Sequence, residues 1–63
     1  MTLKRRRIEA GLTQIEVAER TGIIQPLISD YERGKYKPKY AYAKRLADLF
    51  GCTVAELMDD EEA

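Results

Sequence analysis

The feature that most constrains the fold of this chain is a pair of short helix patterns joined by a glycine. Thr13 and Glu16 have the T-x-x-E spacing of a capping box, in which each side chain bonds to the backbone N–H of the other residue at a helix start. Gly22 supplies the positive φ that ends the first helix abruptly. Pro26 stands in the first turn of the next helix, where its missing N–H costs nothing. The segment predicts helices at about residues 14–21 and 25–33.

The second of these helices has two contrasting faces. At about 100° per residue, Leu27, Ile28 and Tyr31 point to one side and form an apolar face. The opposite, polar face carries Gln25, Pro26, Ser29, Asp30 and Arg33. A helix that packs one face and offers a polar face of this size has the geometry of a helix that enters the DNA major groove.

Together with the rest of the chain, these residues resemble the Cro/CI-type (XRE) helix-turn-helix family, which includes the lambdoid phage repressors. The matching positions in the first part of the chain are Leu12, Thr13, Gln14, Val17, Ala18, Gly22, Ile28, Tyr31, Glu32, Arg33 and Gly34. Those in the second part are Pro38, Leu46, Ala47, Phe50, Gly51, Thr53, Val54 and Leu57. The resemblance covers about residues 3–58 and implies an all-α, compact five-helix domain that binds DNA.

The remaining helices follow from helix-breaking residues and a second capping box. We expect a first helix at about residues 2–10, a fourth at about 39–50, and a short fifth that follows the Thr53–Glu56 capping box and ends at about 58. On the fourth helix, the core-facing stripe is expected at Tyr40, Ala43, Leu46, Ala47 and Phe50. Residues 1–58 are thus expected to form one domain, and the acidic residues 59–63 a frayed tail.

Length and composition narrow the classes of function. A chain of 63 residues has room for one small domain. It has no His and a single cysteine, Cys52, so we expect no metal site, no cofactor and no internal disulfide. We do not expect an enzyme, because no nucleophile with a neighbouring base is visible. No apolar run reaches the length of a membrane span, and a single thiol without a signal peptide indicates the cytoplasm.

The charges are divided unevenly, although eleven basic and eleven acidic residues balance. Residues 1–45 contain all eleven Lys and Arg against five acids, a surplus of six. Residues 46–63 contain six acids and no base. Such asymmetry indicates a basic working surface and an acidic tail.

The resemblance also implies a buried ion pair between Arg7 and Glu32. Leu3, Arg7 and Ala10 share the inner face of the first helix, so the guanidinium lies on a core-facing line and needs a partner. Glu32, at the edge of the inner face of the third helix, is the carboxylate that the family carries at the matching position. The alternative is that Arg7 extends its guanidinium to solvent.

The same resemblance assigns residues that would contact DNA. Gln25 starts the helix that the family inserts into the major groove, and its amide can pair with adenine N7 and N6. Gln14 matches a position that contacts phosphate and can brace this first recognition-helix side chain. The other expected base-reading residues are Pro26, Ser29 and Asp30. The other expected phosphate contacts are Arg33, Lys35, Lys37 and Lys39.

Two residues depart from the family pattern. Ile24 replaces the Ser or Thr that usually precedes the third helix, which removes a helix cap of about 1 kcal/mol. Arg6 stands at a position that is often aliphatic, so the first helix buries less there. Both departures leave the fold intact and the base specificity open.

A surplus of apolar residues on the last two helices indicates a homodimer. Tyr42 and Leu49 lie on a flank of the fourth helix beside its core-facing stripe, and Met58 is a similar surplus on the fifth. Two-fold pairing would let the protein cover two half-sites on DNA. We therefore expect a homodimeric, repressor-like transcriptional regulator with double-stranded DNA as its partner and no small-molecule ligand. The alternative is a protein-interaction module, an antitoxin or adaptor that uses the same fold.

Overall fold

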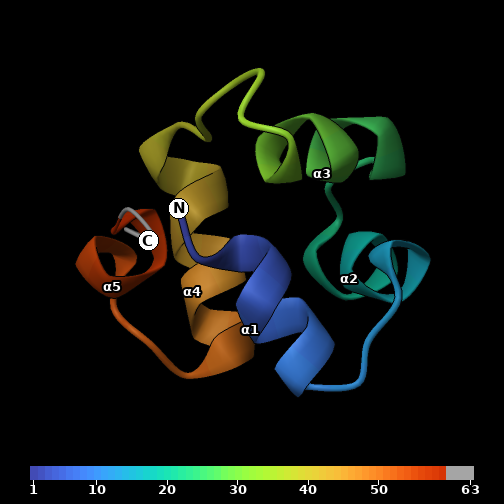
Figure 1. Ribbon diagram of the computed structural model, residues 1–63, viewed down its shortest axis with the longest axis horizontal. Coiled ribbons are helices and arrows are strands. Elements are labelled where there is room, and N and C mark those ends of the chain that lie inside the picture. The colour runs from blue at the N-terminus through green and yellow to red at the C-terminus, as the bar shows by residue number, and fades with distance from the viewer. Residues whose placement is uncertain (60–63) are drawn as a thin grey trace.

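A computed structural model of the protein describes residues 1–59 and confirms the expected all-α fold (Figure 1). The described helices are α1 (Leu3–Glu9), α2 (Gln14–Thr21), α3 (Gln25–Glu32), α4 (Tyr40–Phe50) and α5 (Val54–Met58). Within residues 1–59, no helix has the length and apolar character needed to cross a membrane. Of the expected acidic tail, Asp59 is exposed, and residues 60–63 lie outside the described residues.

Both capping boxes predicted from the sequence are confirmed. At the start of α2, the Glu16 N–H donates to Thr13 Oγ1 at 3.1 Å, and the Thr13 N–H donates to Glu16 Oε1 at 2.9 Å. At the start of α5, the corresponding Thr53–Glu56 bonds measure 3.0 and 2.8 Å. The hydrogen bond from the threonine backbone N–H lowers the pKa of each glutamate, because it favours the ionised carboxylate.

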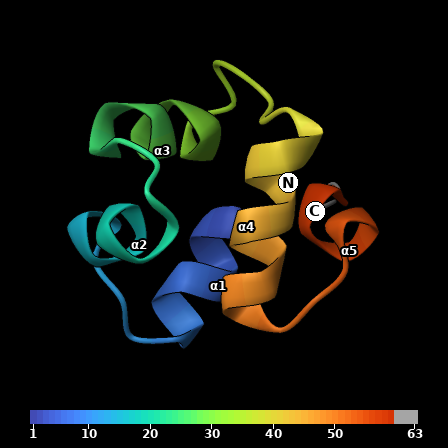
Figure 2. The same ribbon diagram turned by 180° about the vertical axis from the view of Figure 1, so that it is seen from behind.

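The core forms around α4, which packs against α5, α2 and α1. In Figure 1, α4 stands in the middle with α5 on one side and α2 and α3 on the other, while α1 crosses in front of it. Figure 2 shows the same order from behind. The buried apolar residues are Leu3, Val17, Ile23, Ile28, Tyr31, Ala43, Leu46, Ala47 and Leu57.

Two residues that we expected on core-facing lines lie at the surface instead. Tyr40 is 70% exposed, and Ala10 is also exposed. Tyr40 is the first residue of α4, and Ala10 follows the last residue of α1, so both stand at helix ends, outside the packed centre. Both residues lie on the side of their helix that faces the core, as predicted from the helical periodicity. A residue on that side is buried only where a neighbouring helix covers it.

Thr2, near the start of the chain, forms hydrogen bonds with residues of α5. The Thr2 N–H donates to the Leu57 carbonyl oxygen at 2.9 Å. The Thr2 hydroxyl lies 3.1 Å from the carbonyl oxygens of both Glu56 and Leu57 and donates to them, while it accepts from Arg6 Nε at 2.9 Å. Thr2 therefore makes no side-chain cap for α1, and helix 1 begins one residue later than expected, at Leu3.

Candidate nucleic-acid interface

The two faces predicted for α3 are both present. On the inner face Ile28 is fully buried and Tyr31 is 5% exposed. On the outer face Gln25 and Pro26 are exposed, and Ser29 and Asp30 are half-buried. In Figure 1, α3 lies at the edge of the molecule with α2 beside it, so its outer face is open to a partner.

The start of α3 is the least covered part of this helix. Ile24 is its N-cap residue, with φ −65° and ψ 146°, and no side chain bonds to the free backbone N–H groups of the first turn. The Ile24 side chain is 67% exposed. Pro26 lies in the first turn, as predicted. The missing cap predicted from Ile24 is thus confirmed.

The ion pair that the family resemblance implied is present between α1 and α3. Arg7 Nε donates to Glu32 Oε2 at 2.6 Å, and Arg7 Nη2 donates to Glu32 Oε1 at 3.1 Å. Arg7 Nη1 donates to the Leu12 carbonyl oxygen at 2.9 Å. The side chains of Arg7 and Glu32 are only 14% and 4% exposed, and the hydrogen bond with Glu32 raises the pKa of Arg7. The pair is therefore buried, bidentate and satisfied, as a buried guanidinium requires.

Gln14 connects this ion pair to the start of α3. Its Nε2 donates to Glu32 Oε1 at 3.1 Å, and its Oε1 accepts from Gln25 Nε2 at 3.3 Å. Gln14 is half-buried, whereas Gln25 is exposed. The family resemblance suggested the contact between Gln14 and Gln25, but sequence reasoning missed the bond from Gln14 to Glu32.

Asp30 and Arg33, which we assigned to different roles, form an ion pair with each other. Arg33, the C-cap residue of α3, donates from Nη2 to Asp30 Oδ1 at the i,i+3 spacing. The Asp30 side chain is 18% exposed and that of Arg33 is 66% exposed. This spacing favours such pairs on a helix surface and could have predicted the contact.

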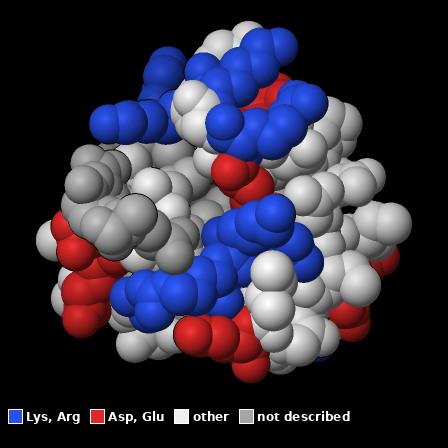
Figure 3. Space-filling view, viewed as in Figure 1, with Lys and Arg blue, Asp and Glu red and all other residues white. Residues whose placement is uncertain are grey.

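The three lysines expected at phosphates all lie in the exposed loop between α3 and α4. Lys35, Lys37 and Lys39 are exposed, and Lys35 Nζ lies 5.5 Å from the centre of the Tyr36 ring. Figure 3 shows Lys and Arg side chains gathered over this loop, at the top, and in a second band across the front of the molecule. Acidic side chains show at the lower left and along the bottom in the same view. One of the two basic groups thus lies at the loop that follows α3, and acidic side chains also show between it and the second group.

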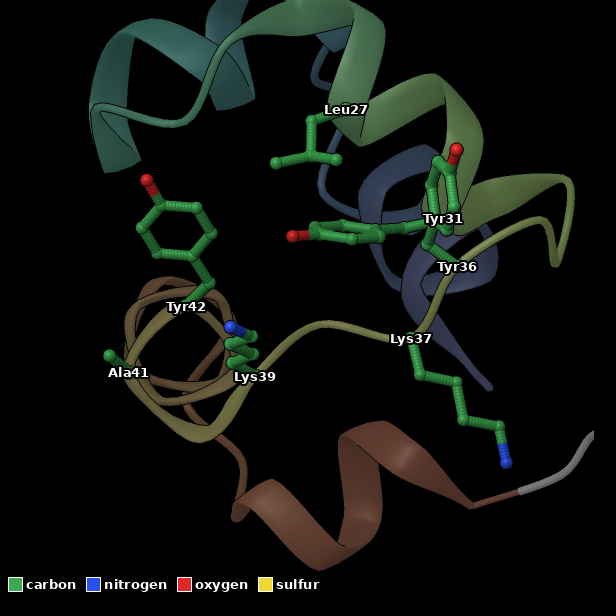
Figure 4. A pocket seen from close by; sticks show the side chains of 7 residues that line it. All are labelled: Leu27, Tyr31, Tyr36, Lys37, Lys39, Ala41 and Tyr42. Atoms are coloured by element: carbon green, nitrogen blue, oxygen red, sulfur yellow. The ribbon is translucent and has the colours of Figure 1, made fainter.

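A surface hollow of about 570 Å³ separates α3 from the start of α4 (Figure 4). In Figure 4, Tyr31 points into the hollow, and Tyr42 points from α4 toward α3. Burial raises the pKa of Tyr31, because it disfavours the charged phenolate. Sequence reasoning missed this hollow. The residues that line it are Leu27, Tyr31, Tyr36, Lys37, Lys39, Ala41 and Tyr42.

The residues expected at a dimer interface are less available than the sequence suggested. Tyr42, Leu49 and Met58 are half-buried and pack against the core of their own chain. The Tyr42 ring also lies 5.2 Å from the Arg45 guanidinium carbon. Their description as a surplus was therefore wrong, since each contacts the core of its own chain. Small domains expose the flanks of their helices, so part of a core residue remains at the surface.

Among residues 1–59, no three His, Cys, Asp or Glu side chains lie where they could hold a metal ion together. Cys52 is half-buried and packs against the core between α4 and α5. This position suits a small apolar residue.

Comparison with known proteins extends these observations. A family model described as helix-turn-helix matches residues 3–57. The chain is 38% identical over 56 residues to the "Cryptic phage CTXphi transcriptional repressor RstR" of Vibrio cholerae. The aligned region covers 89% of this chain and 50% of that protein. It is 41% identical over 49 residues to an HTH-type transcriptional regulator of Methanothermobacter thermautotrophicus, covering 78% of this chain and 71% of that one. An HTH-type transcriptional regulator of Archaeoglobus fulgidus is 36% identical over 58 residues, covering 89% of this chain and 83% of its own. No solved structure gave a match.

Proposed function

The chain belongs to the Cro/CI-type helix-turn-helix family, and we propose that it binds specific sites on double-stranded DNA as a small, repressor-like transcriptional regulator. The names of its relatives support this role, since all three of those described above are transcriptional regulators or repressors. They do not favour the alternative of an antitoxin or adaptor. The chain spans half the length of the phage relative, so the proposal concerns what this domain does.

The observation that carries the proposal is the exposed polar start of α3 beside the exposed basic loop. An α-helix fits the major groove of B-DNA, and the first residues of a recognition helix reach the base edges. Gln25 and Pro26 occupy these positions and are exposed. In our proposal the Gln25 amide pairs with adenine, and Pro26 contacts a thymine methyl group.

The remaining outer residues of α3 have more limited proposed roles. The Ser29 hydroxyl can donate to or accept from a base edge. Ionised Asp30 only accepts, which fits cytosine N4 or adenine N6, but its contact with Arg33 competes with a base. We therefore propose that Gln25 contributes more to base discrimination than Asp30 does.

The lysines of the 35–39 loop, together with Arg33 and Gln14, are the proposed phosphate contacts. Cations that neutralise DNA phosphates release condensed counterions, so affinity falls as salt rises, largely independently of sequence. Lys35, Lys37 and Lys39 are exposed, and no ion pair is recorded for them among residues 1–59. They suit positioning on the DNA backbone rather than base reading.

The test is a binding-site selection from random DNA followed by salt titration of the selected site. We expect a preferred site and a salt slope that becomes shallower by about one unit in Lys35→Ala, on selected and random DNA alike. Lys44→Ala is the matched control, because Lys44 lies on α4 and bonds to Asp48 at 2.8 Å. A protein that selects no sequence and binds random DNA no better than the Lys35→Ala variant would contradict the proposal.

We also propose that the protein acts as a homodimer in the cytoplasm, where its DNA partner would be found. Two copies would cover two half-sites about one helical turn apart. The exposed parts of Leu49 and Met58 are the proposed contacts, with Tyr42 contributing less because it packs toward α3. Sedimentation at micromolar concentration, with and without the selected site, tests this directly. An association state that ignores both Leu49→Lys and Met58→Lys would rule out this interface.

A further inference from the structure

Four side chains form a continuous hydrogen-bonded series from the core to the proposed base-reading residue. Arg7 donates to Glu32, Gln14 donates to Glu32, and Gln25 donates to Gln14. Resting on the proposed function, we propose that Glu32 is a positioning residue for base recognition. Through Gln14 it fixes which end of the Gln25 amide faces the protein, and therefore which base Gln25 prefers.

The direction of the series follows from the chemistry of a carboxylate. An ionised carboxylate only accepts hydrogen bonds, whereas a glutamine amide has one donating end and one accepting end. Gln14 must therefore turn its NH₂ group toward Glu32, and its oxygen is left to face Gln25. Gln25 must then turn its own NH₂ group toward Gln14. The acceptor-only character of Glu32 thus determines the orientation of two successive amides.

Glu32 is well placed to hold this orientation. Its side chain is 4% exposed, and Arg7 contacts both of its oxygens, at 2.6 and 3.1 Å. Arg7 is itself tied to the Leu12 carbonyl oxygen at 2.9 Å. The carboxylate is therefore held in one position, which is what a fixed reference for the two glutamines requires.

The orientation decides what Gln25 can offer to DNA. With one N–H given to Gln14, Gln25 keeps one N–H and its oxygen, which match the N7 acceptor and N6 donor of adenine. If the amide were reversed, its oxygen would accept from Gln14 and both N–H groups would face the base. Two donors match the N7 and O6 acceptors of guanine. The ratio of affinities for adenine and guanine at this base pair is therefore a direct readout of the amide orientation.

The first test is the Glu32→Gln variant. The base pair that Gln25 reads is identified first, as the one at which Gln25→Ala loses its base preference. Binding is then measured on two DNA sites that differ only in having adenine or guanine at this base pair. Arg7 donates to both carboxylate oxygens, and its bond to Oε2 is the shorter, at 2.6 Å against 3.1 Å for Oε1. We therefore expect the carbonyl oxygen of the new amide at the Oε2 position and its NH₂ group at the Oε1 position, where it displaces Arg7 Nη2 and faces Gln14. Gln14 and Gln25 both reverse. We expect the adenine-to-guanine ratio to fall about tenfold, within the roughly 5- to 150-fold discrimination that one bidentate contact gives. Partial unfolding lowers the active concentration equally for both sites, so it leaves the ratio unchanged.

Two substitutions of Gln14 test the same idea with the Arg7–Glu32 pair intact. Lysine at this position only donates, so Gln14→Lys should reverse Gln25 and lower the ratio by about tenfold, as Glu32→Gln does. Glutamate only accepts, so it can take the Gln25 N–H as the Gln14 oxygen does, although its charge repels Glu32. Gln14→Glu should therefore keep the wild-type orientation and change the ratio by less than roughly twofold, while overall affinity falls. A general loss of contact at position 14 would affect the ratio equally in both variants. A fall in the ratio in Gln14→Lys but not in Gln14→Glu would therefore indicate an effect of amide orientation.

The outcomes distinguish this inference from the proposed function. If wild-type protein selects no sequence, the proposed function fails, and the inference fails with it. If it selects a sequence but shows no base preference that depends on Gln25, the proposed function stands and the inference fails. If that preference is present but Gln14→Lys leaves the ratio unchanged, the proposed function stands and the role of Glu32 is wrong. A wild-type preference for guanine over adenine at this base pair would also overturn the inference.

Discussion

The C-terminal end of α3 is enclosed by the rest of the molecule, whereas its N-terminal end projects from it. At the C-terminal end, Tyr31 is 5% exposed and the Glu32 side chain 4% exposed. At the other end, Ile24 is 67% exposed, and Gln25 and Pro26 are exposed as well. One helix of eight residues thus carries stability at one end and the proposed recognition at the other. Substitutions in α3 should therefore separate into those that unfold the domain and those that only weaken DNA binding.

The largest effect that this comparison predicts is at the enclosed end. Glu32→Ala leaves the Arg7 guanidinium buried without its carboxylate, which costs about 3–5 kcal/mol. For so small a domain this is a large part of the total free energy of unfolding. Urea or thermal denaturation followed by circular dichroism measures it. Glu19→Ala, which removes an exposed carboxylate from α2, is the control and should change the stability little. Similar small losses in both variants would remove the distinction between the two ends.

Substitutions at the projecting N-terminal end of α3 should weaken DNA binding and leave the stability unchanged. Gln25→Ala is expected to cost about 1–3 kcal/mol on the selected site and little on random DNA, because a base contact is lost while phosphate contacts remain. The melting temperature should stay close to that of the wild type, since the side chain is exposed. Fluorescence anisotropy on both DNAs, together with a thermal melt, checks these expectations. An equal loss of affinity on both DNAs would exclude base reading by Gln25.

The sequence predicted the body of this domain better than its surface. Capping boxes, glycines and apolar spacing placed all five helices to within about one residue at each end. These signals are local, because each depends on residues three or four positions apart. Exposure at helix ends depends on which neighbour covers them, and that is why Tyr40 was misplaced.

Only those features of the candidate site that the family resemblance implies were predicted from the sequence. That resemblance supplied the Arg7–Glu32 pair and the likeness of Gln25 to a base-reading residue. It did not supply the contact between Gln14 and Glu32, which joins residues 18 positions apart and depends on the packing of α2 against α3. The hollow between α3 and α4 was missed for the same reason, since its lining residues come from two helices and a loop.

A smaller, stabilising effect is expected from giving α3 the cap that it lacks. Ile24 already has the extended φ and ψ of an N-cap residue, and its side chain is mostly exposed. Ile24→Ser should therefore stabilise the domain by about 1 kcal/mol, because the hydroxyl can accept from a free N–H of the first turn. Denaturant midpoints measure the change. Ile15→Ser, at an exposed isoleucine inside α2, is the matched control and should give no gain.

The smallest expected effect is on the stability of the protein at acid pH. Here the start of α2 is compared with the start of α3. The capping-box bond lowers the pKa of Glu16, so its contribution to stability is present above its unfolded pKa of about 4.3 and is lost as pH falls through the lower folded value. The first turn of α3 contains no acidic residue and makes no such contribution. Glu16→Gln should therefore reduce the loss of melting temperature between neutral pH and about pH 3. An unchanged pH dependence would show that the box contributes nothing as an ion.

The contact of Thr2 with α5 has a consequence for how the protein forms. It joins residues 55 positions apart, so the cost of closing nearly the whole chain must be met before this contact can form. On the ribosome, where residues appear one after another from the N-terminus, α1 through α3 can associate early. The domain is completed only after residue 57 has left the exit tunnel. Until then the nascent chain presents α3 without the packing of α5, so we expect DNA recognition to become available only late in synthesis, as a single event.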